Sequence, residues 1–182
     1  MSWNTDTPIG QIVTSLPGST GRYYDSRIST SYTTFTLVAN TLYAVPFLAE
    51  RTTTYTTIAL EVSTLASSKS VRLGIYTDGG GVPNALILDA GTVSTTTTGA
   101  KTISISQVLS ANWYWLAAVS DGTPGLRAIS QTAIPMLGAS SGTDTTIHVG
   151  WSVSFTYAAL PNPFTGGGAL MTTAAPRLML SI

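Results

Sequence analysis

Apolar side chains along this chain recur mostly at every second position. That period places alternate side chains on one face of a β-strand, whereas a helix would repeat every three to four residues. Seven stretches show it in whole or in part: 32–38, 42–48, 52–63, 71–76, 101–108, 112–119 and 147–157. Ile58, Val62 and Leu65 have helical spacing too, but the run of threonines before them favours a strand.

The rest of the chain is organised around one stretch, residues 71–91. Val71, Leu73 and Ile75 alternate with more polar residues, and the pattern then breaks at Asp78, three glycines and Pro83. Glycine admits positive φ angles and proline fixes φ, so the chain is expected to reverse there. Apolar residues resume at 86–88 and stop at Asp89-Ala90-Gly91. We therefore predict a long β-hairpin or β-arch, with the rest of the chain built to pair with it and cover it.

Turn signals separate the predicted strands at regular intervals. They include Asn40, the segment 121–125, and Pro161 to Pro163. Many short strands between turns are typical of a sandwich or a barrel. We predict an all-β fold, a jelly-roll-like antiparallel β-sandwich of about eight strands over residues 23–182, in which residues 176–182 form a buried strand.

Residues 1–22 are predicted to be an extended N-terminal arm. Pro8 and Pro17-Gly18 discourage a helix and a central strand. The segment nevertheless holds five large apolar residues, which a disordered tail would lack: Trp3, Ile9, Ile12, Val13 and Leu16. We expect these five to bind a partner chain. The alternatives are a frayed terminus and an arm folded back over its own sandwich.

Composition limits the classes of function. Charged residues make up 9% of the 182, with eight acids against eight bases, so a nucleic-acid partner is not expected. Apolar runs are too short for a membrane span, and no signal peptide is recognisable. There is no cysteine, whereas threonine reaches 31 residues. A surface so poor in charge has little electrostatic repulsion, which favours a chain covered by partners over one that is merely soluble.

Candidate chemistry is sparse. His148 lies on the polar face of the 147–157 pattern with Asp144 as the nearest acid, and we interpret it as an exposed strand residue. Asp78 and its glycines lack the repeated acids of a calcium loop, and glycines 166–168 lack the lysine of a phosphate loop, so both are interpreted as turns. We predict no catalytic residue, no metal site and no cofactor.

Three aromatic residues, Trp113, Tyr114 and Trp115, follow one another in the 112–119 stretch. Aromatic faces of this kind could stack on a sugar ring. Alternation forbids placing all three on one face of a strand. The stronger interpretation puts Trp113 and Trp115 in the core, with Tyr114 pointing outward.

Four blocks resemble a known family. They are Leu42-Tyr43-Ala44-Val45-Pro46-Phe47, Val71-Arg72-Leu73-Gly74-Ile75-Tyr76, then Pro83, Leu86 and Gly91, and finally Trp113-Tyr114-Trp115-Leu116-Ala117. Their order resembles the jelly-roll module of tailed-bacteriophage virion proteins, which occurs in tail fibres, head fibres and capsid decoration proteins. The resemblance covers about residues 23–138 and rests on core and turn positions.

The resemblance implies a homotrimer on the virion surface and no enzymatic activity. A long N-terminal anchor or shaft, as in the fibre versions, is not recognisable, which favours a small accessory capsid protein. The expected function is therefore a capsid decoration or cement protein that binds the major capsid protein or another virion protein. The alternative is a receptor-binding head or tail fibre domain whose partner is a host surface glycan.

Overall fold

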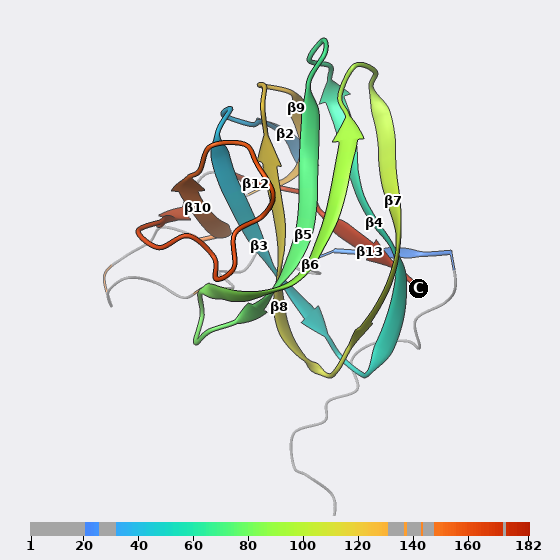
Figure 1. Ribbon diagram of the computed structural model, residues 1–182, viewed down its shortest axis with the longest axis vertical. Helices are drawn as coiled ribbons and strands as arrows, with labels where there is room; N and C mark the ends of the chain where they lie inside the picture. Colours follow the sequence, from blue (N-terminus) through green and yellow to red (C-terminus); the bar gives the residue numbers. More distant parts are fainter. Residues whose placement is uncertain (1–20, 26–31, 131–136, 138–142, 144–147, 173) are drawn as a thin grey trace, which may run out of the picture.

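The computed structural model describes residues 21–25, 32–130, 137, 143, 148–172 and 174–182. Two antiparallel sheets pack face to face (Figure 1), and the described residues contain no helix. The thirteen strands of these ranges are β1 (Tyr23–Tyr24), β2 (Tyr32–Thr36), β3 (Thr41–Ala49), β4 (Thr53–Thr64), β5 (Ser70–Asp78), β6 (Pro83–Ser94), β7 (Gly99–Leu109), β8 (Asn112–Ser120), β9 (Gly125–Ser130), β10 (Gly150–Ser154), β11 (Ala169–Met171), β12 (Ala174–Pro176) and β13 (Met179–Ser181).

Eight consecutive strands, β2 to β9, have jelly-roll connectivity. β2, β9, β4 and β7 are neighbours in that order in one sheet, and β3, β8, β5 and β6 in the other. Apart from the β5–β6 hairpin, each connection crosses from one sheet to the other. This is the double-sheet solution that leaves few exposed edges in an antiparallel fold. The predicted all-β jelly-roll sandwich of about eight strands is confirmed.

The main core lies between the two sheets. Alternate residues of facing strands meet there, among them Leu60 of β4, Leu73 of β5 and Leu116 of β8, and all three are fully buried. Aromatic side chains pack edge to face within this layer, with Phe47 and Tyr55 5.6 Å apart between ring centroids. Ile58, Leu60 and Val62 contribute to the core from strand β4, so the strand prediction for this stretch is confirmed.

The C-terminal residues are inserted within the seven-stranded sheet. β9 pairs with β4 only at its start, through Leu126 and Gly125. Beyond that point β12 pairs with β9, and β13 pairs with β4 and with β1. Leu178 and Leu180 are buried in the core between the sheets. The buried strand predicted for residues 176–182 therefore exists as the short strand β13, and it is additional to the eight jelly-roll strands.

Residues 155–168 lie across the six-stranded sheet on the face turned away from the core. We call this segment the cap, and Figure 1 draws it in orange beside β10. Leu160 and Phe164 of the cap pack with Leu42, Tyr76 and Trp115 in a second apolar cluster. The six-stranded sheet is therefore buried on both faces along most of β3, β5 and β8, which have near-continuous buried stretches.

Hydrogen bonds attach the cap to strands on either side. The Tyr76 hydroxyl donates to the Pro161 carbonyl at 2.9 Å, and the Phe164 amide donates to the Asn84 carbonyl at 2.7 Å. Asp89 accepts the Leu160 amide at 3.0 Å and both of its carboxylate oxygens accept from Arg72 Nε. Burial raises the pKa of Asp89, but these hydrogen bonds and the Arg72 charge outweigh it, so that the pKa lies below its ordinary value.

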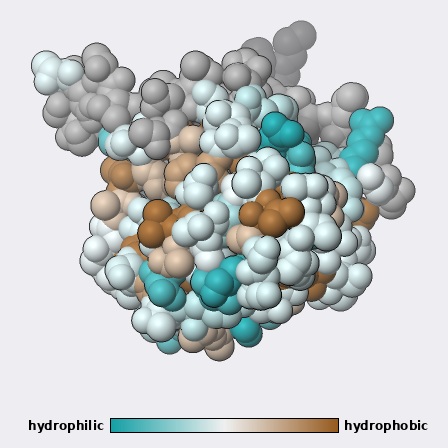
Figure 2. Space-filling model, turned by 90° about the horizontal axis from the view of Figure 1, so that it is seen from above, coloured by the Kyte–Doolittle hydropathy of each residue, from teal (hydrophilic) through white to brown (hydrophobic). Residues whose placement is uncertain are grey.

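The seven-stranded sheet has exposed positions on its outer face along β4 and β7. β7 alternates strictly between half-buried and exposed positions, and the exposed side chains on these two strands include Thr54, Thr56, Thr102, Ser104, Ser106 and Val108. The exposed residues of β7 on this face carry no charge, and the one charged residue of β4 there, Glu61, is paired with Arg127. Figure 2 shows a similar character at one end of the sandwich, where near-neutral side chains dominate and strongly hydrophilic ones are few.

Two predicted strand boundaries are wrong. β6 does not stop at Asp89-Ala90-Gly91 but continues to Ser94, because Gly91 adopts a φ of 97° and the register with β5 shifts there. β10 is shorter than the 147–157 pattern, since the chain leaves the sheet after Ser154, where the Phe155 amide donates to the Asn40 carbonyl.

Candidate functional site

One row of β8 side chains runs from the covered to the uncovered part of the six-stranded sheet. Val119, Ala117 and Trp115 belong to the cluster under the cap and are 0–1% exposed. Trp113, the next member of the row, is 41% exposed. The cap therefore covers Trp115 but does not reach Trp113, which is partly exposed to solvent.

The prediction for the three aromatic residues is therefore wrong for Trp113 and Tyr114, and correct in that Trp115 is buried. Tyr114 points into the core between the sheets and is only 7% exposed, whereas Trp113 is on the solvent side. Trp115 is buried, but under the cap instead of between the sheets. The predicted alternation of side chains along β8 is confirmed. The sequence pattern did not show that protein covers both faces of β8 from Tyr114 to Val119.

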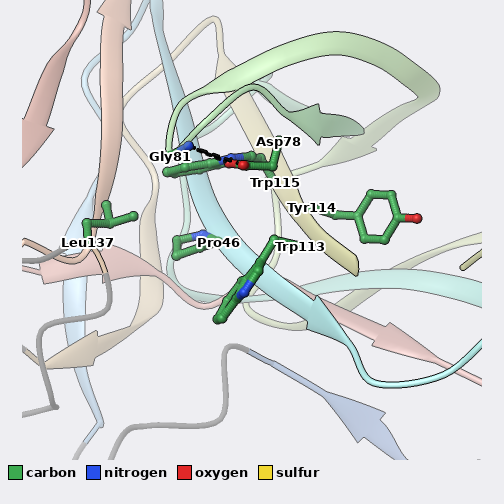
Figure 3. Close-up of a pocket in the computed structure, with 7 residues that line it drawn as sticks. All are labelled: Pro46, Asp78, Gly81, Trp113, Tyr114, Trp115 and Leu137. Carbon is green, nitrogen blue, oxygen red and sulfur yellow. Dashed lines mark hydrogen bonds between the residues drawn. The ribbon is translucent and has the colours of Figure 1, made fainter. Parts of the chain in front are cut away.

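A cleft of about 230 Å³ opens beside Trp113. Its lining residues are Pro46, Asp78, Gly81, Trp113, Tyr114, Trp115 and Leu137. Figure 3 shows Pro46 between Trp113 and Trp115, while the ring of Tyr114 points away from the other side chains. The floor of the cleft is thus apolar, and its polar groups come from one side, the tip of the β5–β6 hairpin.

Asp78 holds that tip in place. Its carboxylate accepts the amides of Gly80 and Gly81 at 3.0–3.1 Å, and Gly80 and Gly81 have φ angles of 85° and 91°. Oδ1 of the same carboxylate accepts the indole N–H of Trp115 at 2.8 Å. The interpretation of Asp78 and its glycines as a turn is confirmed. Asp78 also fixes the Trp115 ring, which forms one wall of the cleft.

Pro46 occupies a position where a strand tolerates proline. It pairs with Trp115 on β8, but on its other side β10 pairs with β3 only over residues 41–44. Pro46 is therefore at an edge of β3 that β10 does not reach, and its missing N–H removes no ladder bond to β10. The end of β10 leaves room for the cleft at this point.

Other carboxylates of the described residues take part in structural contacts. Glu61 accepts from Arg127 at 3.0 Å, and Asp25 accepts from Arg177 Nε at 2.5 Å. The hydrogen bond from Arg127 holds the pKa of Glu61 below its ordinary value. Arg177 also lies over the Tyr32 ring, 4.5 Å from its centroid, so it joins the C-terminal insertion to β1 and β2. Within the described ranges, no group of three or more potential metal-ligating residues converges.

The remaining candidates of the sequence lie away from the cleft or outside the described residues. His148 is buried, with 6% exposure, so its interpretation as an exposed strand residue is wrong. Asp144 and the five apolar arm residues Trp3, Ile9, Ile12, Val13 and Leu16 are outside the described ranges. Gly167 has a φ of 81° in the cap, in agreement with a turn there. Among described residues no helix is long and apolar enough to cross a membrane.

No protein-family model matches the chain, and no curated protein sequence matches it.

Proposed function

We propose that this chain is a non-enzymatic structural protein of a tailed-bacteriophage virion, a capsid decoration or cement protein that binds the capsid surface as a homotrimer. Support comes first from the sequence blocks that resemble the virion jelly-roll module. Three of them form neighbouring strands of one sheet, namely β3, β5 and β8, and the block from Pro83 to Gly91 forms β6 beside β5.

The observation that carries the proposal is the uncharged outer face of the edge strand β7. Threonine and serine hydroxyls can be buried against another chain at a much lower desolvation cost than charged groups, because they need only a hydrogen-bond partner. A strand pair that ends in solvent commonly carries charged residues against edge-to-edge association. Among the exposed positions of this face, Thr102, Ser104 and Ser106 follow one another on the edge strand β7 without a charge between them.

The ion pairs of two acidic residues, Glu61 and Asp89, also support a structural role. Glu61 and Asp89 both have lowered pKa values because arginines donate hydrogen bonds to them, so each is poised to remain charged and paired at neutral pH. A general acid would need a raised value. In the described part of the chain, Glu61 links β4 to β9 through Arg127, and Asp89 links β6 to β5 through Arg72 and to the cap through the Leu160 amide.

Light scattering tests the assembly. We expect a particle of three times 18.9 kDa. A Ser104→Arg variant would place a charge in the middle of the β7 face and should release monomers, while Ser67→Arg, in the exposed turn between β4 and β5, should leave the trimer intact. A wild-type chain that stays monomeric on concentrating would contradict the proposal.

Deletion of Met1 to Leu16 tests the arm. If the arm is the capsid anchor, the truncated chain stays folded and trimeric but no longer binds capsids that lack it. Each large apolar side chain that docks could contribute about 1.5–3 kcal/mol, and three copies would add avidity. Unfolding of the truncated chain, or unchanged capsid binding, would show that the arm has another role.

The second candidate is a receptor-binding fibre domain that recognises a host surface glycan. The cleft beside Trp113 is the feature that favours it, because an exposed aromatic ring on a rigid strand suits a sugar. The two roles differ in where the chain lies on the particle. A reconstruction of the intact virion that shows its position and copy number distinguishes a capsid lattice from a fibre tip.

A further inference from the structure

The cleft beside Trp113 combines one apolar side with one polar side. Trp113, Pro46 and Leu137 supply the apolar surface, and Trp113 is the most open of the three aromatic residues in the lining. The face of an indole carries a negative quadrupole that attracts polarised C–H groups. A ligand that fits should therefore have a flat face of C–H groups on this side.

The polar side is formed by the hairpin tip. The lining residues include one charged side chain, the carboxylate of Asp78, and no basic residue. Asp78 already accepts hydrogen bonds from Gly80, Gly81 and Trp115, so its charge is partly spread over those donors. Because the Gly81 amide is shared between both oxygens, the three donors use about three of the four lone-pair sites of the carboxylate, and about one is left for a hydroxyl donor. The ligand should thus carry hydroxyls at the edge of its apolar face.

We propose that this cleft binds one neutral pyranose ring, which stacks on Trp113 and directs hydroxyl groups toward Asp78 and the backbone of Gly81. A pyranose has both required features, an apolar face of axial C–H groups and an equatorial rim of hydroxyls. The site goes beyond the decoration role proposed above, and it rests on the second candidate, a glycan-binding fibre domain, for which it names the residues that would hold one ring.

Size and charge argue against other ligands. The volume of about 230 Å³ is below that of pockets for drug-sized molecules, so the cleft suits a single ring. An anionic ligand would face Asp78 without a cation to pair with. A purely apolar ligand would cover the carboxylate and leave it without water. A quaternary ammonium ion prefers a cage of several aromatic faces, whereas Tyr114 points away and Trp115 is 1% exposed.

The cleft is also pre-formed. Trp113 is on β8, where it pairs with Leu48 of β3, and its backbone N–H donates to Asn112 Oδ1 at 2.8 Å. Trp115 is held by its indole hydrogen bond to Asp78. Little ordering is therefore needed when a ring binds, and low ordering cost is what lets a small contact area give measurable affinity.

The test is an NMR titration of the full chain that follows the indole N–H signals of its four tryptophans. Probes are glucose, galactose, mannose and N-acetylglucosamine, with tetramethylammonium chloride as the cationic comparison. Trp113→Phe assigns the Trp113 signal. Trp113→Ala is the loss variant, and Leu65→Ala, which removes another exposed apolar side chain in the turn after β4, is the matched control.

We expect at least one of the four sugars to shift the Trp113 signal saturably, with a dissociation constant on the order of 1 mM, as suits one small ring. Trp113→Ala should weaken that binding at least tenfold, while Leu65→Ala leaves it unchanged. Three results would overturn the proposal: none of the sugars shifts the signal, Trp113→Ala binds as wild type does, or tetramethylammonium saturates the site while no sugar does.

Discussion

The two sheets of this jelly roll receive the C-terminal third of the chain in different ways. In the seven-stranded sheet, β12 and β13 fill the space where β9 diverges from β4, so they become part of the sheet. In the six-stranded sheet, the cap lies on the outer face and pairs with the sheet mainly through side chains and loop amides. One sheet is completed from within, whereas the other is extended at its β3 edge by β10 and β11 and covered on its outer face by the cap.

This difference explains which residues are exposed. The six-stranded sheet is buried on both faces wherever the cap reaches, and its strand β8 is apolar at consecutive positions from Tyr114 to Val119. The seven-stranded sheet has no such cover over the exposed positions of β7, and there threonine and serine alternate with isoleucine. A continuous apolar run indicates two covered faces, and strict alternation indicates one.

The largest test removes the inserted strand. Deleting residues 178–182 takes away Leu178 and Leu180, both buried in the main core, together with the pairing of β13 to β4 and β1. Each buried leucine is worth about 1.5–3 kcal/mol, and a whole domain is stable by only about 5–15 kcal/mol. We expect the truncated chain to lose its cooperative thermal transition. A melting temperature within a few degrees of wild type would mean that β13 is dispensable.

The second test compares the two tryptophans of one row. Trp115→Ala should lower the free energy of unfolding by about 3–5 kcal/mol, because it leaves a cavity under the cap and removes one of the hydrogen bonds that Asp78 accepts. Trp113→Ala should cost clearly less, about 1–2 kcal/mol, since that side chain is 41% exposed and its removal leaves no enclosed cavity. Urea unfolding of both variants measures the difference. Equal costs would show that the cap does not end between the two residues.

The third test adds volume under the cap. A Cβ at Gly74 would lie 2.2 Å from Leu160 Cδ1 and 2.5 Å from the Leu88 carbonyl oxygen. Overpacking of this kind typically costs about 1–3 kcal/mol, so Gly74→Ala should destabilise the protein by that amount. Gly166→Ala, within the cap itself, meets nothing within 4 Å and serves as the control. If both variants unfold at the same urea concentration, Leu160 does not pack against Gly74.

The sequence predicted the sandwich, the hairpin and most strands because each depends on local pattern. Alternation marks a half-buried strand, and Asp78 with its glycines forms a turn by hydrogen bonds within a few residues. The place of Pro46 at an edge of β3 that β10 does not reach also agrees with a local rule, the missing N–H. The jelly-roll fold was predicted from the number and spacing of the strands, and the observed strand order agrees with it.

The candidate site could not be predicted from pattern, because it depends on where a distant segment stops. Residues 155–168 cover Trp115 but not Trp113, and nothing in the local sequence of β8 encodes that limit. A signal was present all the same: the run 113–119 is apolar without interruption, which is unusual for a sheet that faces solvent on one side.

The smallest expected effect concerns how pH acts on the cap. Because the pKa of Asp89 is lowered in the folded chain, its contribution to stability is complete above the ordinary aspartate pKa of about 3.9 and is lost as the pH falls through the lower, folded value. Protonation of Asp89 removes the negative charge that pairs with Arg72 and weakens the hydrogen bond from the Leu160 amide. The cap should therefore loosen in acid.

Asp89→Asn isolates this contribution, because it keeps the size of the side chain but cannot be protonated in that range. We expect the free energy of unfolding of the variant to fall less steeply than that of wild type below about pH 4. Glu61→Gln is the matched control on the other sheet, since Glu61 also has a lowered pKa but contacts Arg127 and not the cap. Near pH 3, hydrogen exchange at the Leu160 amide should quicken in wild type and in Glu61→Gln alike. If that amide stays protected while the whole protein loses stability, Asp89 acts on the β5–β6 pair alone and the cap is held by its apolar contacts.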